Sequence, residues 1–572
     1  MERNLPRNSK RVANESLGVS LPDDCLIIPR GDVSDESDIE DDAVGNEENI
    51  TSSSSDNEDV EDCVYRWRRR SNGHFPVPFS SSEDIPHIPE TPYSQFKTYF
   101  DDDMFEYIAD QTNLYSVFKS GTSIDTNALE IEQLFSIWMY MGVFSSPSYR
   151  DYWNNRTRWP CIADIMPVNR YEKLMQYFHL CDINGQKPGD PGYDPLFKVR
   201  KMFDVVRNKC RSEPQEEFQC IDEQIIPFKG RHINKQYLPA KPHRYGFKMI
   251  TRGSSSGLIY DFVMYAGKHT ELIEPKPNMS TTANCVRTLC FSIPRSVQNT
   301  KMFMDNFYIT LDLMMHLKQK FNIQTTGTVR SNRLHGCPLL SEKELKAQGR
   351  GAFDQMVDAN SNLTIVRWLD NRAVILASTY LEAKPLTTVK RWDAKAKARV
   401  EVSRPNIVGV YNIHMGGIDL SDMLLAMYQN QRKSRKWYFR VIYYLIWTAL
   451  SNCWLLYRKS LQKENDIPGN RLSFKDFLLQ VAEGLSKVNK ICRNRPGRPS
   501  RGPEQTLKRL RASDENIPLE ILRKDHIDHL PKHAEKGRCK NCKTGFSRWT
   551  CHKCRVHLCL NDKNNCFTNY HL

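Results

Sequence analysis

Apolar residues recur at helical spacing through the first third of the chain, from about Thr98 onward. Residues 129–144 give the clearest case, and residues 171–180 and 197–206 repeat it on either side of a loop rich in glycine and proline at 186–195. Because this spacing gathers apolar side chains on one helix face, it predicts a mostly helical N-terminal third.

At Phe218 the pattern changes to short apolar runs separated by turn residues. Runs of this length predict strands, and residues 252–257 join two of them in a hairpin. A later strand, helix and strand (the helix at 309–321) complete a mixed α/β layout with one sheet. The expected strands are residues 218–228, 247–251, 258–265, 301–307 and 323–329, with a further β-rich patch at 363–379.

Helical spacing returns after Gly416 and Gly417, over residues 419–431, 441–460 and 474–488. The longest apolar run, 441–457, is shorter than the roughly 20 residues that span a bilayer, so it predicts a buried helix. Residues 1–30 lack the apolar core of a secretory signal, and the 17 cysteines are an odd number, which favours a reducing compartment. We expect a soluble protein of the nucleus.

Charge is distributed unevenly along the chain. Residues 31–65 contain 14 Asp and Glu and no Lys or Arg, a composition typical of a disordered segment. Since the whole chain carries +13, the remainder carries +27. Such an excess on a folded body indicates a polyanionic partner, most often nucleic acid.

Four aspartates lie where a solvated carboxylate is not expected: Asp222, Asp305, Asp419 and Asp422. The first interrupts an apolar strand, the second ends one, and the last two share a helix face. Burial of an unpaired carboxylate is costly, so a cation is expected nearby, and oxygen ligands favour Mg²⁺ or Mn²⁺ over zinc. The alternatives are a helix N-cap for Asp419 and a turn for Asp305.

Two basic segments are candidates for phosphate contacts. The first contains Lys241, Arg244 and Lys248, and the second contains Arg432, Lys433, Arg435, Lys436 and Trp437. Trp437 is a candidate for stacking on an unpaired base, but packing onto the following buried helix is the favoured alternative. Residues 493–502 have the composition of a basic linker or nuclear-localisation signal, with an AT-hook as the weaker reading.

The C-terminal residues contain two Cys-x2-Cys pairs and three further candidate ligands for metal. A segment of this size has too little core to fold unaided, so structural zinc is preferred over a disulfide framework. Two ions need eight ligands, and His557, His552 and Asp562 remain open for the eighth place. The seven clear ligands are Cys539, Cys542, Cys551, Cys554, Cys559, Cys566 and His571.

Several separated motifs resemble the piggyBac family of DNA transposases, in the same order and at similar spacing, from about Tyr93 to the C-terminus. They are Ile221-Asp222-Glu223-Gln224 with Phe228-Lys229-Gly230-Arg231, Lys241-Pro242 with Tyr245-Gly246 and Lys248, Met304-Asp305-Asn306-Phe307, and Gly416-Gly417-Ile418-Asp419 with Asp422.

The resemblance implies a catalytic triad of Asp222, Asp305 and Asp419 on an RNase H-like core, with Asp422 as an accompanying fourth acid. It further implies a dimeric enzyme that moves DNA by cut and paste into TTAA sites through hairpin ends. For the C-terminal module it implies a zinc finger with two cross-braced zinc ions. This module would bind the transposon's terminal inverted repeats. Cys539 and Cys542 would pair with Cys559, and Cys551 and Cys554 with Cys566 and His571, leaving Asp562 or His557 for the eighth position.

The expected fold is therefore a multidomain α/β protein, whose mixed-sheet catalytic core carries a β-rich insertion and is flanked by a split all-α domain. A disordered acidic N-terminus precedes it and a zinc finger follows. The expected divisions are 1–92 (acidic region and linker), 93–217 and 431–490 (helical dimerisation and DNA-binding domain), 218–330 and 405–430 (catalytic core), 331–404 (insertion), 491–535 (basic linker) and 536–572 (zinc finger).

Two other functions compete with the transposase reading. A domesticated DNA-binding or chromatin protein would keep the fold without the reaction, although all four acidic positions hold Asp. A RING-like protein of ubiquitin transfer would explain the cysteine-rich tail but leaves the four acids without a role.

Overall fold

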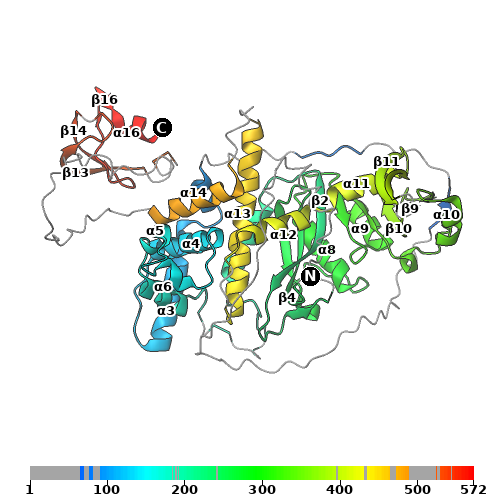
Figure 1. Cartoon of the computed structure of the whole chain (residues 1–572), viewed down its shortest axis with the longest axis horizontal. Coiled ribbons are helices and arrows are strands. Elements are labelled where there is room, and N and C mark those ends of the chain that lie inside the picture. The colour runs from blue at the N-terminus through cyan, green and yellow to red at the C-terminus, as the bar shows by residue number, and fades with distance from the viewer. Residues whose placement is uncertain are drawn as a thin grey trace. The chain divides into compact units, whose positions relative to one another are not determined.

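The structure is a computed structural model (Figure 1). It describes residues 65–69, 77–81, 91–182, 185–186, 190, 192–239, 243–393, 397–430, 434–463, 472–487, 523–524, 529–542 and 544–572. The acidic segment up to Val64 and the basic linker at 493–502 lie outside the described residues.

The chain divides into two compact units, each described here by itself. The first, which we call the sheet unit, comprises Met1–Pro86, Gln186–Met427 and Lys433–Leu455. The second, the helical unit, comprises His87–Gly185, Tyr428–Arg432 and Leu456–Leu572. Both units are therefore assembled from segments that are far apart in the sequence.

A ten-stranded mixed sheet forms the centre of the sheet unit. The strand β2 lies between β4, which is antiparallel to it, and β6, which is parallel; β5 extends the antiparallel side and β7 the parallel side. The bounds confirm the strands expected from the apolar runs and add β3, which no apolar run predicted. They are β2 (Phe218–Pro227), β3 (Lys235–Tyr237), β4 (Tyr245–Ser254), β5 (Ile259–Met264), β6 (Lys301–Met304) and β7 (Gln324–Thr328).

The expected β-rich insertion continues this same sheet. Strand β10 pairs antiparallel with β7 and with β9, and β9 pairs with β8. A separate two-stranded ribbon, β11–β12, follows and packs with α11 around a small apolar core. These elements are β8 (Phe353–Asp358), β9 (Thr364–Leu369), β10 (Ala373–Ser378), β11 (Thr387–Asp393), β12 (Ala398–Arg404) and α10 (Glu342–Gln348).

Residues before the expected start of order complete the edge of the sheet. The short strand β1 (Trp67–Arg68) pairs with β8, and the Arg69 guanidinium lies 2.5 Å from a carboxylate oxygen of Asp354. Farther along, the Val77 carbonyl accepts a hydrogen bond of 2.6 Å from the buried Lys301 ammonium. The expectation that ordered structure begins only after the linker that ends at residue 92 was therefore wrong, because backbone pairing at a sheet edge needs no apolar periodicity.

Helices cover the sheet and form its principal core. The helices α8 and α9 pack together over an apolar cluster that includes Ile221 and Met304. The Thr310 side chain caps the N-terminus of α9, and Asn322 ends it in the left-handed conformation. The helices of this unit are α7 (Arg200–Arg211), α8 (Thr281–Phe291), α9 (Leu311–Phe321), α11 (Asn406–His414), α12 (Gly417–Met427) and the first part of α13 (Trp437–Lys463).

The apolar helix α13 is the one described helix long and apolar enough to cross a membrane, but its apolar window is 94% buried inside the protein. This confirms the expectation of a buried core helix.

The helical unit contains the helices expected at 129–144 and 171–180, whereas the helix expected at 197–206 is α7 of the sheet unit. The helix α14 packs against α4 and α2, and the Ser136 hydroxyl donates to the Ala482 carbonyl at 2.6 Å. A Cβ at Gly484 would lie 2.5 Å from the Tyr93 ring, so this close approach requires glycine. The helices are α2 (Pro92–Lys97), α3 (Asp102–Ser120), α4 (Ala128–Val143), α5 (Pro160–Ala163), α6 (Val168–Tyr177) and α14 (Phe474–Lys487).

Candidate functional site

Asp222 and Asp305 lie on neighbouring strands at the same level. The strands β2 and β6 are parallel with Ile221 opposite Met304, so the residues that follow this pair are Asp222 and Asp305. Adjacent strands are about 4.8 Å apart, and the two residues continue the register by one position. Two residues that are 83 positions apart in the sequence therefore become neighbours at this edge of the parallel strand pair.

Asp419 is brought to this point by the close packing of α12 on β2 and β4. A Cβ at Gly417 would lie 2.1 Å from the Ser254 carbonyl oxygen and 2.9 Å from the Cys220 sulfur, so only glycine permits this approach. The pKa of the Cys220 thiol is raised to about 12, mainly by burial and in part by repulsion from Asp222 and Asp419. Both carboxylates are therefore within electrostatic reach of the same sulfur atom.

Hydrogen bonds orient the carboxylates of Asp305 and Asp222. The Thr328 hydroxyl donates to Asp305 Oδ1 at 2.8 Å, and the Asn306 N–H donates to the same oxygen at 2.6 Å. The Glu223 N–H donates to Asp222 Oδ1 at 2.8 Å. In both aspartates, the backbone N–H of the next residue therefore holds Oδ1 and fixes the orientation of the carboxylate.

The oxygens of the three aspartates are not gathered around a single point. Among the described residues, two groups have one ligand atom from every member within 4.8 Å of all the others, and neither contains Asp222, Asp305 or Asp419. Two divalent ions about 3.5–4 Å apart, each with ligand oxygens at about 2.1 Å, can be bound by oxygens that lie up to about 8 Å from one another. A two-ion site therefore does not need all three carboxylates at one point. The oxygen-only donor set fits Mg²⁺ or Mn²⁺ in such a paired site.

Gln224 links the strand of Asp222 to the helix of Asp419. Its side chain is 1% exposed, and its Nε2 donates to Asp422 Oδ1 at 2.7 Å. Its Oε1 accepts hydrogen bonds from the Thr251 hydroxyl at 3.1 Å and the Tyr444 hydroxyl at 2.8 Å. Because the amide donates on one side and accepts on the other, its orientation is fixed and it ties β2, β4, α12 and α13 together. Sequence reasoning gave Gln224 no role, although it lies two residues after Asp222.

The structure separates the candidate phosphate-binding residues into three kinds. Lys241, Arg432 and Lys433 lie outside the described residues, whereas Arg244 and Arg435 are exposed. Lys248 is 7% exposed, and its ammonium lies 4.1 Å from the Phe307 ring centroid and 5.8 Å from that of Tyr265. This burial is at odds with the solvent-facing phosphate contact expected for Lys248.

Trp437 packs inside the sheet unit rather than presenting its ring to solvent. It is 9% exposed, and its ring centroid lies 4.4 Å from His232 and 5.8 Å from Phe247. Burial, with repulsion from Lys198, lowers the pKa of His232 to about 4, so this imidazole is neutral at pH 7. The burial agrees with the favoured alternative for Trp437, although the ring packs on His232 and Phe247 and not only on the following helix. This packing brings the segment before α13, with Arg435 and Lys436, to the loop that follows β2.

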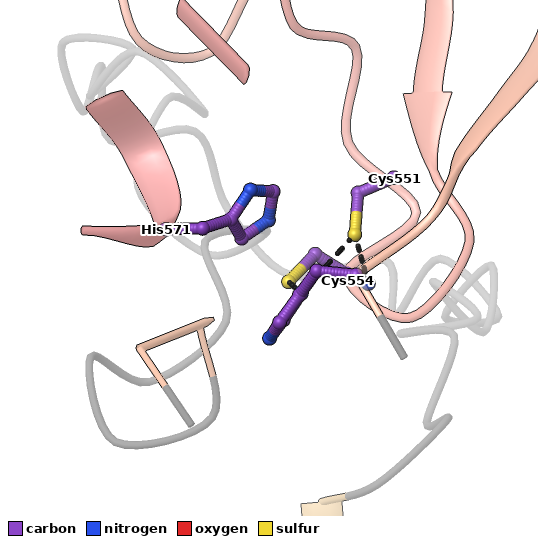
Figure 2. Close-up of side chains that lie close together, drawn as sticks. Cys551, Cys554 and His571 are labelled. Carbon is purple, nitrogen blue, oxygen red and sulfur yellow. Dashed lines mark hydrogen bonds between the residues drawn. The ribbon is translucent and has the colours of Figure 1, made fainter. Parts of the chain in front are cut away.

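The cysteine-rich tail forms two four-residue groups suited to zinc. One contains Cys539, Cys542, Cys559 and Cys566, and the other contains His529, Cys551, Cys554 and His571. Within the second group, His529 Nδ1 lies 3.3 Å from the Cys551 sulfur and 3.5 Å from the Cys554 sulfur. Figure 2 shows both sulfur atoms near the imidazole of His571.

Two expectations about the zinc ligands were wrong. Cys566 joins Cys539, Cys542 and Cys559, instead of pairing with Cys551, Cys554 and His571. The residue that completes the second group is His529, because the hairpin of β13 (Pro531–Arg538) and β14 (Phe546–Cys551) places Pro531 opposite Cys551. The candidates Asp562 and His552 are exposed, and His557 packs against Gly537.

The second group has the outer contacts typical of a metal site. His571 Nδ1 donates to the Phe567 carbonyl at 2.7 Å, and its Nε2 is buried with no hydrogen-bond partner among the described residues. A metal-binding histidine usually donates its other N–H to a carbonyl in this way. In the first group, a Cβ at Gly545 would lie 2.8 Å from the Cys559 sulfur, so glycine leaves room for the thiolates. Both groups therefore fit tetrahedral zinc.

Three kinds of comparison place the chain among known proteins. A family model described as Transposase IS4 matches residues 91–454. The human PiggyBac transposable element-derived protein 3 is 28% identical over 488 residues, which are 85% of this chain and 77% of the relative. The human PiggyBac transposable element-derived protein 2 is 28% identical over 405 residues, 70% of this chain and 66% of the relative.

Among solved structures, the fold is similar to that of a piggyBac transposase in a cryo-EM synaptic complex with hairpin DNA. The TM-score is 0.61 at 20% identity, and the match covers 86% of this chain and 100% of the other. Because the family model covers well over half of the sequence and both relatives carry the piggyBac name, this chain belongs to the piggyBac-type transposase family.

Proposed function

We propose that the protein is a cut-and-paste DNA transposase that nicks transposon ends, passes through hairpin intermediates and joins the freed 3′ ends to TTAA target sites. The observation that carries the proposal is the placement of three aspartates on adjoining elements: Asp222 and Asp305 each follow one residue of the pair Ile221–Met304 on parallel strands, and α12, with Asp419 in its first turn, packs against β2. Family membership supports the same reaction class.

In this proposal the strands β5, β4, β2, β6 and β7, in that order, form an RNase H-like core, with three antiparallel strands followed by two parallel ones. Asp222, Asp305 and Asp419 would hold two divalent ions, Mg²⁺ or Mn²⁺. When bound, the ions supply Lewis acidity that activates a water or hydroxyl nucleophile and stabilises the leaving oxygen of the DNA backbone.

The chain's own residues keep these ligands in position. The Thr328 hydroxyl and the Asn306 N–H both donate to Oδ1 of Asp305. Because the carboxylate is planar, these two contacts also fix the direction of Oδ2. The hydrogen bond from Gln224 to Asp422 fixes the position of α12 on β2. Asp422 is therefore a positioning residue in this mechanism. The metal ligands stand on a strand, a strand end and a helix, which are more rigid supports than loops.

We further propose that the C-terminal module carries two structural zinc ions and binds the terminal inverted repeats. Its described surface is rich in Lys and Arg, including Lys532, Lys536, Arg548 and Arg555. A homodimer acting in the nucleus completes the proposal, as the family resemblance implies. The partner is DNA, since the related solved complex contains hairpin DNA.

A second candidate is a domesticated DNA-binding or chromatin protein without catalysis. The observation that favours it is that both human relatives are named as transposable element-derived proteins. Incubation of the purified full chain with TTAA-flanked transposon-end DNA and Mg²⁺ distinguishes the two. We expect nicks and hairpin ends, and DNA binding without strand breaks in Mg²⁺ or Mn²⁺ would favour the second candidate.

Exchange of the two partners of the Gln224–Asp422 hydrogen bond tests the positioning role. Gln224→Glu alone sets two carboxylates at the position of the 2.7 Å contact, and we expect at least about a tenfold loss of cleavage rate. The double variant Gln224→Glu/Asp422→Asn restores a donor opposite an acceptor, and the introduced carboxylate still accepts from Thr251 and Tyr444. We expect the double variant to cleave within a few-fold of wild type.

The comparison that decides this test is Asp422→Asn alone. If Asp422 instead binds a metal ion, the double variant remains at least as slow as Asp422→Asn, because the carboxylate is absent from both. The free energy of unfolding, measured for all four proteins in denaturant, provides a second double-mutant cycle that does not depend on catalysis.

A further inference from the structure

The segment between β2 and β4 combines positive charge with exposed aromatic rings. Residues 228–246 contain no Asp or Glu, and the described basic residues among them are Lys229, Arg231, Lys235 and Arg244. A run of charge alone is usually a solvated surface. The geometry of the aromatic residues gives this surface a more specific character.

Tyr237 and Tyr245 are directly opposite each other on β3 and β4, so they lie on the same face of the ribbon. Their ring centroids are 4.8 Å apart, yet the two residues remain 54% and 47% exposed. The Lys235 ammonium lies 5.5 Å from the centroid of the Tyr245 ring. About half of each residue of this cross-strand aromatic pair therefore faces solvent.

The base of the ribbon is closely packed. A Cβ at Gly246 would lie 2.2 Å from the Ile226 carbonyl oxygen, so β4 runs against β2 at the closest possible distance. The Leu238 N–H donates to the Arg244 carbonyl at 2.7 Å and continues the ladder beyond Tyr237 and Tyr245. Below the exposed pair, Phe247 packs on His232 and Trp437. The two tyrosines are therefore carried by a closely packed, hydrogen-bonded part of the sheet.

We propose that Tyr237 and Tyr245 form a stacking platform for unpaired DNA bases, and that the surrounding Lys and Arg side chains bind the phosphates of the same strand. The inference rests on the proposed function, in that DNA is the ligand. Aromatic rings interleaved with cations are the usual features of surfaces that bind single-stranded or distorted DNA, because every base has a face that can stack. A duplex backbone alone would need only the charges.

Charge selects DNA over a protein partner for this surface. Exposed tyrosines also occur at protein interfaces, but four described cations without any acid between residues 228 and 246 favour a polyanion. Trp437 brings two more basic residues, Arg435 and Lys436, to the same region. Pro227 lies five positions after Asp222 along β2, about 17 Å at the rise of a strand. The platform would therefore contact nucleotides several positions from the cleaved bond.

Binding of the full chain to fluorescent DNA, in EDTA so that no strand is cut, tests the proposal. The probes are a DNA hairpin with an unpaired loop, a single strand and a blunt duplex of equal length. For Tyr237→Ala/Tyr245→Ala we expect affinity for the hairpin and the single strand to fall on the order of tenfold to a hundredfold, with a change below about twofold for the duplex. Tyr237→Phe/Tyr245→Phe should bind like wild type, because the rings remain.

Trp392→Ala is the matched control, since Trp392 is 61% exposed on the basic ribbon β11–β12. We expect it to leave all three affinities unchanged. Equal binding of the hairpin by the alanine variant and wild type, an equal loss for hairpin and duplex, or the same loss in Trp392→Ala would overturn the proposal. A wild-type chain that binds the hairpin but never cleaves DNA would refute the transposase function while leaving this binding test intact.

Discussion

Asp305→Asn is expected to lower the rate of DNA cleavage by about a thousandfold or more while the protein folds and binds DNA as before. Asparagine keeps the shape of the side chain, and its Oδ1 still accepts from the Thr328 hydroxyl and the Asn306 N–H. The substitution therefore removes one negative charge and little else. Loss of a group that stabilises developing charge in a water-excluded site typically costs a factor of about 10²–10³, and a metal ligand is worth at least that much.

Cleavage of a labelled transposon end in Mg²⁺, under single-turnover conditions, measures this effect. Thr328→Val provides a graded comparison, because it removes a hydrogen bond to the carboxylate but keeps the charge, and we expect a loss of about tenfold to a hundredfold. Asp312→Asn is the matched acid control, since Asp312 contacts Tyr65 and His335. Cleavage by Asp305→Asn at near the wild-type rate would remove Asp305 from the reaction.

The strands that carry the candidate acids could be predicted from the sequence, but their meeting could not. The apolar runs around Asp222 and before Asp305 identify a buried strand and a strand end. The register that sets Ile221 opposite Met304 depends on backbone pairing across 83 residues, which no local pattern encodes. Likewise, the approach of α12 depends on the absence of a side chain at Gly417 against Ser254, a contact between distant segments.

The short strand β1 escaped prediction for a related reason. Its two residues, Trp67 and Arg68, lie in a run that is basic and followed by proline and serine, which is the composition of a linker. The strand is held by pairing with the edge of β8, by the ion pair of Arg69 with Asp354 and by a hydrogen bond from Tyr65 to Asp312 at 3.1 Å. None of these partners is near it in the sequence.

The zinc ligands show how far spacing alone can lead. Two Cys-x2-Cys pairs and the following Cys and His residues indicate two ions, and the structure gathers all seven of those side chains into two groups. Spacing does not specify which later ligand joins which Cys-x2-Cys pair, because the loops between the ligands can lead the chain to either site. The eighth ligand, His529, precedes the first Cys-x2-Cys pair and reaches Cys551 only through the β13–β14 hairpin.

Removal of His529 is therefore expected to abolish one of two zinc sites. Purified wild-type chain should contain two zinc ions, whereas His529→Ala should retain one after exposure to a moderate chelator. Structural zinc contributes about 10–16 kcal/mol of apparent binding free energy in small finger domains at pH 7, so an equal share for one of four ligands is about 2.5–4 kcal/mol, or about two to three powers of ten in affinity. Metal content by mass spectrometry measures the change, and His552→Ala, an exposed histidine near the same site, should keep both ions.

The ligand pairing has a spectroscopic signature that metal content lacks. With cobalt in place of zinc, the grouping found here gives one site with four thiolates and one with two thiolates and two imidazoles, whereas the pairing expected from resemblance would give sites with three thiolates each. The energy of the cobalt ligand-field bands depends on the number of thiolates, so the sum of a four-sulfur and a two-sulfur spectrum is expected. Cys566→Ser should alter only the four-sulfur component, because Cys566 lies with Cys539, Cys542 and Cys559. A change in the bands of the histidine-containing site instead would return Cys566 to His571 and reverse the pairing.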